Sequence, residues 1–248
     1  MLMARTFGLI GYPLTHSFSK KYFTEKFEHE GVEGVSYELF SLENIGMLEQ
    51  ILHEHHNLKG LNVTIPYKIG VLKYVTDLDP AAAAIGAVNC LKINRETKTI
   101  KGFNTDAYGF EASLKPFLKS HHTKALIFGD GGAAQAVKYV LGQLDIPFLS
   151  VVRKKQEGSI GYDDLTGELL AEYTILINTT PLGTFPDIDA CPEIPYAYLT
   201  PEHLAYDLIY NPEETVFLRR ARLQGAQTKN GLEMLTLQAE KSWEIWNS

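Results

Sequence analysis

The most restrictive feature of this 248-residue sequence is a run of glycines between a short apolar stretch and a helical pattern. The apolar stretch covers residues 125–128, Gly129-Asp130-Gly131-Gly132 follows, and a helix is predicted over 133–144. This order fits G-x-G-x-x-G/A, in which glycine permits a tight turn and lets backbone approach a pyrophosphate. The free N–H groups at the helix start would favour the phosphates. We therefore predict a dinucleotide-binding βαβ unit rather than a turn that needs glycine only for steric reasons.

The end of the next predicted strand, 148–152, bears on which dinucleotide is bound. In units that bind NAD, an acid about 20 residues after the first glycine contacts the ribose. Here no Asp or Glu ends the strand, and the cations Arg153, Lys154 and Lys155 follow it. Positive charge at this place suits the 2′-phosphate of NADP, although solvated basic turns are also common. The pattern favours NADP over NAD.

Apolar stretches and helical patterns alternate along the whole chain, which is typical of an α/β protein. In the first half, strands are predicted at 7–10, 37–39 and 61–65, helices at about 19–30, 45–55 and 109–118, and a hairpin at 90–102. In the second half, further strands are predicted at 173–177 and 204–209, and a final helix at 232–246. We predict two α/β domains, an N-terminal substrate domain and a Rossmann-like dinucleotide-binding domain, with the C-terminal helix returning to the first. The expected ranges are 1–106 with 231–248 for the substrate-binding catalytic domain, and 107–230 for the dinucleotide domain.

Composition excludes several classes of protein. With 23 Lys and Arg against 30 Asp and Glu, the net charge of −7 argues against general nucleic-acid binding. Cys90 and Cys191 are far apart, and the run 53–56 (His-Glu-His-His) lacks a fourth ligand, so neither a disulfide framework nor a metal site is expected. The chain shows no signal peptide and no stretch of the ~18 apolar residues that a membrane span needs. A cytoplasmic protein without membrane partners is expected, as a monomer or homodimer.

Four polar groupings stand at predicted strand ends or turns of the first half, where sites on open α/β sheets usually lie. They are His16-Ser17-Phe18-Ser19, the run 62–68 (N-V-T-I-P-Y-K), the run 86–89 (G-A-V-N) and the run 102–106 (G-F-N-T-D). Taken singly, each has a structural explanation, such as a helix N-cap at Ser17 or a cap at Asp106.

Taken together and in this order, the groupings resemble the shikimate dehydrogenase family. Its pattern is Ser-x-Ser after the first strand, then N-V-T-x-P-x-K, G-A-V-N and N-T-D before the dinucleotide domain. The later motifs also match: the glycine loop, I-N-x-T at 177–180, Y-D-x-x-Y at 206–210 and N-G-L-x-M-L-x-x-Q-A at 230–239. The resemblance spans residues 11–239.

The resemblance implies an NADP-dependent dehydrogenase that interconverts 3-dehydroshikimate and shikimate in aromatic amino acid biosynthesis. Its implied catalytic pair is Lys68 and Asp106. The implied substrate-binding residues are Ser17, Ser19, Thr64, Asn89, Tyr210 and Gln238. The implied cofactor-binding residues are Gly129, Asp130, Gly131, Gly132, Ala133, Arg153, Lys154, Leu208 and Gly231, and no metal is implied.

The chemistry of these residue types is consistent with such a reaction. Hydride transfer to a ketone builds negative charge on oxygen, which needs a proton or a donor. A lysine ammonium can donate, and a neighbouring carboxylate can orient it. Two alternatives remain: a quinate/shikimate dehydrogenase that uses NAD, and a non-catalytic NADP-binding regulator of the same fold.

Overall fold

The computed structural model describes residues 5–14 and 17–248, and these form two compact units. One unit comprises residues up to Thr105 together with Ala239–Ser248, and the other comprises Asp106–Gln238. The boundary near the C-terminus thus falls inside the last helix, whereas the sequence placed it at 230/231. Which residues serve the substrate and which serve the dinucleotide stays a prediction. His16, part of the first polar grouping, lies outside the described residues.

The first unit is built on a mixed six-stranded sheet in the order β2-β1-β3-β5-β6-β4. Its strands are β1 (Arg5–Gly11), β2 (Val35–Ser41), β3 (Leu58–Val63), β4 (Asp77–Leu78), β5 (Cys90–Asn94) and β6 (Thr99–Phe103). Strands β1, β2 and β3 run parallel, while β5 is antiparallel to both β3 and β6. The predicted hairpin at 90–102 is confirmed as β5 and β6.

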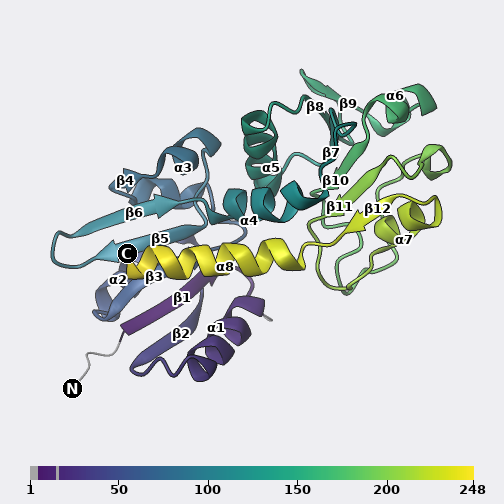
Figure 1. The fold of residues 1–248 in the computed structure, drawn as a ribbon. Coiled ribbons are helices and arrows are strands. Elements are labelled where there is room, and N and C mark those ends of the chain that lie inside the picture. The colour runs from purple at the N-terminus through teal and green to yellow at the C-terminus, as the bar shows by residue number, and fades with distance from the viewer. Residues whose placement is uncertain (1–4, 15–16) are drawn as a thin grey trace. The chain divides into compact units, whose positions relative to one another are not determined.

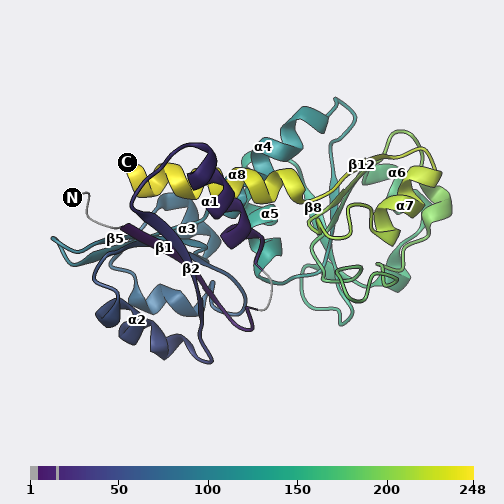
Figure 2. The ribbon, with the colours of Figure 1, turned by 90° about the horizontal axis from the view of Figure 1, so that it is seen from below.

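Helices cover both faces of this sheet (Figure 2). On one face lie α1 (Phe18–His29) and the C-terminal half of α8 (Leu232–Asn247), whose Trp243 and Trp246 pack with Phe7 and Phe23. On the other lie α2 (Leu48–Glu54) and α3 (Pro80–Ile85), with the short 3₁₀ turns η1 (Ile45–Met47) and η2 (Gly70–Tyr74). The indole Nε1 of Trp246 donates to the Leu91 carbonyl at 3.0 Å, so the end of the chain is fastened to β5.

The second unit is built on an all-parallel six-stranded sheet in the order β12-β11-β10-β7-β8-β9 (Figure 1). Its strands are β7 (Ala125–Phe128), β8 (Phe148–Val151), β9 (Ser159–Ile160), β10 (Ile175–Asn178), β11 (Leu204–Asp207) and β12 (Gln227–Lys229). Its helices are α4 (Thr105–Leu114), α5 (Gly132–Gln143), α6 (Gly167–Glu172), α7 (Val216–Leu223) and the first turns of α8, with the 3₁₀ turns η3 (Lys115–Phe117), η4 (Tyr162–Asp164) and η5 (Tyr196–Tyr198). Strands β7, β10 and β11 are short and completely buried, as expected where helices cover both faces of a parallel sheet. The predicted α/β class and the Rossmann-like second sheet are confirmed.

Several predicted boundaries are wrong by a few residues. The helix predicted at 109–118 is α4, which starts at Thr105 and gives way to a 3₁₀ turn at Lys115, because Pro116 has no N–H to continue the helix. The helix predicted at 45–55 begins as a 3₁₀ turn before α2. Helix α7 was not predicted, although Thr215 caps it and its apolar residues follow the helical period.

Candidate functional site

In the first unit, the polar motifs gather at one edge of the sheet. Because β5 is antiparallel to β3, the start of β5 lies beside the end of β3, with Asn62 opposite Cys90. The end of β6 lies there too, since Cys90 also pairs with Phe103. The topology therefore places Thr64, which follows β3, at the same edge as Asn89 and the end of β6.

A buried hydrogen-bond network ties these motifs together. The amide of Asn89 accepts from the Thr105 backbone N–H at 2.6 Å and donates to its hydroxyl at 3.0 Å. Asn62 Nδ2 donates to Ser242 Oγ at 2.9 Å, and Tyr37 Oη donates to Asn62 Oδ1 at 2.8 Å. Asn62 Nδ2 also donates to the Asn89 carbonyl at 3.4 Å, and the hydroxyls of Thr105 and Ser242 lie 3.2 Å apart, so residues of three separate motifs share one network. Ser242 and Tyr37 had no predicted role, because no local pattern marks a contact made across the sheet.

The two predicted catalytic residues stand on well-defined backbone. Lys68 is half-buried between β3 and η2, and its carbonyl accepts from the Val88 N–H at 2.8 Å, which joins two of the polar motifs. Asp106 lies in the first turn of α4 and opens the second unit. Since the two residues belong to different units, their pairing stays a prediction.

The serine pair stands at the start of α1, as predicted. The Ser17 hydroxyl accepts from the Lys20 N–H at 3.3 Å and so caps the helix, and both serines are half-buried. The side chain of Ser19 forms a hydrogen bond with the side chain of Tyr37. The structural explanation for Ser17 thus holds, and it leaves the second lone pair and the proton of the hydroxyl to be used by a ligand.

The other predicted substrate residues lie in the second unit. Tyr210 follows β11 and is 38% exposed, and burial of part of its ring raises the pKa of the phenol. Gln238 is the last residue of this unit, buried in α8 with its Nε2 donating to the Leu235 carbonyl at 2.9 Å. Their role toward a substrate stays a prediction.

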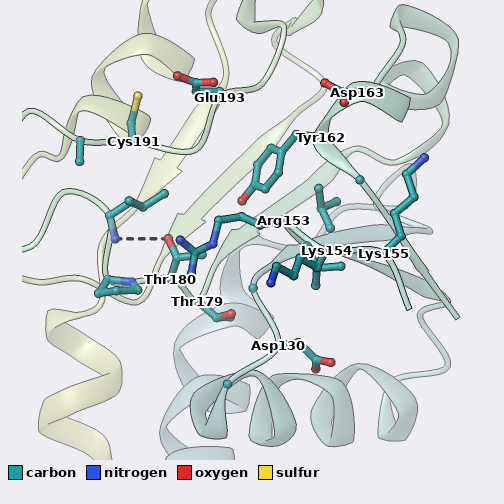
Figure 3. Close-up of a pocket in the computed structure, with 18 of the residues that line it drawn as sticks. Asp130, Arg153, Lys154, Lys155, Tyr162, Asp163, Thr179, Thr180, Cys191 and Glu193 are labelled. Atoms are coloured by element: carbon teal, nitrogen blue, oxygen red, sulfur yellow. Dashed lines mark hydrogen bonds between the residues drawn. The ribbon is translucent and has the colours of Figure 1, made fainter. Parts of the chain in front are cut away.

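The second unit contains a groove of about 1460 Å³ at the carboxyl ends of β7, β8 and β10. We call it the switch-point groove, because the strand order reverses direction at β7, where ligands bind on such sheets. Its lining includes Gly129, Gly131, Arg153, Tyr162, Thr180 and Arg220. The predicted glycine loop and the predicted cations are therefore neighbours in one groove (Figure 3).

The glycine loop has the backbone that the motif requires. Gly129 has φ +98°, and a Cβ there would lie 2.9 Å from Thr179 Oγ1. By contrast, a Cβ on Gly131 or Gly132 would meet no atom within 4 Å. The absence of side chains at these two positions thus leaves open space at the start of α5, where a phosphate could approach the backbone N–H groups.

The three cations after β8 are not equivalent. Arg153 and Lys154 are exposed, and neither forms an ion pair within the described part of the chain. Lys155 pairs with Asp164 at 2.7 Å, and Figure 3 shows it extending away from the other two. Two of the three cations are therefore available to an anion in the groove.

Asp130, the second residue of the loop, is engaged with protein groups on both carboxylate oxygens. Lys138 and Gln135 of α5 bond to Oδ1, and Gln156 Nε2 donates to Oδ2 at 2.6 Å. The carboxylate thereby links the glycine loop to the segment that follows Arg153 and Lys154. We expect it to act in the groove mainly by holding these two segments together.

The residues predicted at the nicotinamide end also meet. A Cβ on Gly231 would lie 2.0 Å from the carbonyl oxygen of Leu208, so only glycine fits there. The Gly231 N–H donates to the Ile209 carbonyl at 3.0 Å.

Asp207, the residue before Leu208, is completely buried. Its carboxylate accepts hydrogen bonds from Asn178 Nδ2 at 3.0 Å and from the Thr215 hydroxyl at 2.6 Å. The sequence analysis included Asn178 and Asp207 in the motifs I-N-x-T and Y-D-x-x-Y but gave them no role, and Thr215 stands in no motif.

Asp207 should make the protein less stable as the pH rises from 4 to 7. Burial raises its pKa from 3.8 to about 6, so the folded protein holds this proton more tightly than the unfolded chain does. This tighter proton binding adds about 3 kcal/mol to the free energy of unfolding. The added stability is fully present below about pH 4 and is lost as the pH rises through 6. Denaturant unfolding at a series of pH values, for wild type and Asp207→Asn, would measure it. Identical pH dependences of the unfolding free energy would contradict it.

Two further observations concern metals and membranes. Within residues 5–14 and 17–248, no three His, Cys, Asp or Glu side chains are grouped as a metal site would need. In the same residues, no helix has the length and apolar character to cross a membrane.

Comparison with known proteins identifies the family. The shikimate dehydrogenase substrate binding domain matches residues 9–91. A shikimate dehydrogenase (NADP(+)) of Desulforamulus reducens is 35% identical over 96% of this chain and 88% of its own length. The crystal structure of a chorismate mutase/shikimate 5-dehydrogenase fusion protein from Clostridium acetobutylicum has 38% identity and a TM-score of 0.87, over 99% of this chain and 91% of that one.

Two other solved structures differ in cofactor or substrate. Shikimate 5-dehydrogenase from Listeria monocytogenes, in complex with shikimate and NAD, is 29% identical with a TM-score of 0.84, over 98% of this chain and 92% of that one. The 5-ketofructose reductase of Gluconobacter sp. strain CHM43 is 28% identical with a TM-score of 0.82, over 99% of this chain and 94% of that one. The likeness thus extends to proteins with NAD or with another substrate. From the extent of the match to the first two proteins, the chain belongs to the shikimate dehydrogenase family of oxidoreductases, which act with a nicotinamide dinucleotide in aromatic biosynthesis.

Proposed function

We propose that this protein catalyses the reversible, NADP-dependent reduction of 3-dehydroshikimate to shikimate. The observation that carries the proposal is the pair Arg153 and Lys154, exposed and without ion-pair partners in the described chain, at the end of β8 in the switch-point groove. A 2′-phosphate would supply the negative charge that these cations lack. NAD offers only a 2′-hydroxyl at that place, and β8 ends with no acid to accept from it.

The residues present fit an NADP molecule. Gly131 and Gly132 leave open space at the start of α5, where the pyrophosphate would take backbone N–H donors, and Gly129 and Ala133 complete the loop. Leu208 and Gly231 would border the nicotinamide ring. When bound, NADPH supplies the hydride, so the protein must provide orientation and a proton.

For the substrate, Ser17 and Ser19 would donate their hydroxyls to the carboxylate at the start of α1, with help from Tyr210. Thr64, Asn89 and Gln238 would bind ring hydroxyls. The topology supports this assignment for Thr64 and Asn89, because it brings the residue after β3 and the residue before β5 to the same edge of the sheet.

For the chemistry, Lys68 Nζ would donate a proton to the oxygen that becomes negative as the ketone is reduced. The carboxylate of Asp106 would orient the ammonium and keep it charged. In the oxidation direction the same lysine, once neutral, would accept the hydroxyl proton. The backbone anchor of Lys68 on Val88 supports the role, since a proton donor acts best from a fixed base.

Initial rates of shikimate and quinate oxidation, each with NADP and with NAD, test the proposal directly. We expect shikimate with NADP to give the highest kcat/KM. Preference for NAD and quinate would favour the quinate/shikimate dehydrogenase alternative, and nucleotide binding without turnover would favour a regulator. The protein would act in the cytoplasm, as a monomer or homodimer.

Ser17→Ala is expected to have two separable effects. The loss of the cap should lower the unfolding free energy by about 1 kcal/mol. The loss of a carboxylate donor should raise KM for shikimate and leave KM for NADP unchanged. Steady-state kinetics and denaturant unfolding would measure both, with Thr166→Ala as the matched control, because Thr166 caps α6 in the same way. If both variants changed only stability, Ser17 would be a cap and nothing more.

A further inference from the structure

The fully buried carboxylate of Asp207 has no part in the chemistry above. Three donors surround it: Asn178 Nδ2 and the Ile209 N–H, each 3.0 Å from Oδ1, and the Thr215 hydroxyl, 2.6 Å from Oδ2. No lysine, arginine or histidine of the described residues forms an ion pair with it. A carboxylate buried without a cation costs free energy, and apolar residues dominate the core around it. Its bonds reach three different segments, which suggests what it does there.

The first bond leads to the switch-point groove. Asn178 ends β10, and its Oδ1 accepts from both the backbone N–H and the hydroxyl of Thr180, at 3.0 and 2.6 Å. Thr180 lines the groove. Because Asn178 donates to Asp207 with its other end, the carboxylate sets which way the amide faces, and so where Thr180 is held.

The second bond leads to the proposed nicotinamide end. The Ile209 N–H bonds back to the carboxylate two residues earlier and closes a turn around Leu208. The turn faces Gly231, whose N–H bonds to the Ile209 carbonyl and whose Cα approaches the Leu208 carbonyl so closely that no Cβ fits. The third bond, from Thr215, ties Asp207 Oδ2 to the N-cap of α7; Thr215 itself does not line the groove, although Arg220 further along that helix does.

We propose that Asp207 is a positioning residue for the dinucleotide: its Oδ1 holds Thr180, through Asn178, and Leu208, through Ile209, in the arrangement that the cofactor requires. This inference rests on the proposed function in that it takes the switch-point groove as the cofactor site. It does not depend on which substrate is reduced. What the site needs from Asp207 is the hydrogen-bond acceptor Oδ1, and not the negative charge.

Three variants separate positioning from stability. Asp207→Ala removes all three bonds and should raise the dissociation constant for NADPH at least tenfold, with KM for shikimate changed less than twofold. Asp207→Asn keeps an oxygen for Asn178 and Ile209 and should stay within about threefold of wild type. Thr215→Val removes the hydroxyl that bonds to Asp207 Oδ2 and caps α7, but it leaves both bonds to Oδ1, so it should lower stability while leaving NADPH affinity within about threefold. Fluorescence titration with NADPH, without substrate, gives the affinity, and denaturant unfolding gives the stability.

The outcomes are distinct. Unchanged NADPH affinity in folded Asp207→Ala would overturn the inference, and so would an equal loss in Asp207→Asn and Asp207→Ala. If Asp207→Ala does not fold, Asn178→Ala carries the test, because it severs Thr180 from the carboxylate; a fivefold or greater loss of NADPH affinity supports the inference and an unchanged affinity overturns it. A wild type that binds NADPH but does not oxidise shikimate would refute the proposed reaction alone. A wild type that binds no NADPH would refute both.

Discussion

Lys68→Ala is expected to lower kcat for shikimate oxidation by on the order of 10²–10⁴, the usual contribution of a positioned acid or base. If the ammonium stabilises the charge that develops on oxygen, its effect appears in the transition state more than in the ground state, so KM should change little. Steady-state kinetics with saturating NADP would measure both constants. The prediction depends on Lys68 touching the reacting oxygen, for which its fixed backbone between β3 and η2 is a necessary condition.

The matched control is Lys73→Ala. Lys73 is an exposed lysine of η2, five residues further along, whose ammonium lies 5.0 Å from the Tyr74 ring centroid. The Lys73→Ala substitution removes the same charge from the same unit and should leave kcat within about twofold of the wild-type value. A Lys68→Ala enzyme with near-normal kcat and a much higher KM would show that Lys68 binds substrate and that another group donates the proton.

The partner of Lys68 can be tested by a double-mutant cycle. Asp106→Asn should also lower kcat. If the two residues act as one unit, the double variant should lose less than the sum of the single losses, expressed as activation free energies. Additive losses would show that Asp106 and Lys68 act independently, and the pairing would then be wrong.

Arg153→Ala is expected to raise KM for NADP by about 10- to 150-fold and to change KM for NAD little. The guanidinium would form a charged hydrogen bond to the 2′-phosphate, and such bonds contribute about 1.5–3 kcal/mol. Since NAD has no phosphate there, the same substitution removes nothing from its binding. Initial rates over a range of each cofactor concentration would measure the two KM values.

Lys155→Ala is the matched control for this substitution. It removes an equal charge two residues away, but Lys155 is paired with Asp164 instead of being available to the groove. Its effect on KM for NADP should stay below about threefold. Equal effects of Arg153→Ala on both cofactors would refute recognition of the 2′-phosphate, and equal effects of the two variants would show that only net charge matters.

Much of the fold follows from local patterns in the sequence. The glycine loop, the apolar strands 125–128 and 173–177 and the periodic helix after Gly132 each lie within a few neighbouring residues, where turn geometry and side-chain period act. The structure shows β7, α5, β8 and β10 at these places. The short helix α7 and the edge strands β9 and β12 were not predicted, because their patterns span only two to eight residues and their pairing partners supply most of their stability.

For the site, ordered local motifs were enough to indicate the family, the α/β class and the residue types that the chemistry needs. How those residues are held became apparent only from the three-dimensional structure. It distinguished Lys155 from Arg153 and Lys154 through an ion pair with Asp164, and it joined Asn89 to Thr105 in one buried network. It also showed how Asp207, known from the sequence only as part of Y-D-x-x-Y, is held by three donors from β10, from its own turn and from the cap of α7. A hydrogen bond between segments distant along the chain depends on how the sheets stack their strands, and no local pattern in the sequence encodes that.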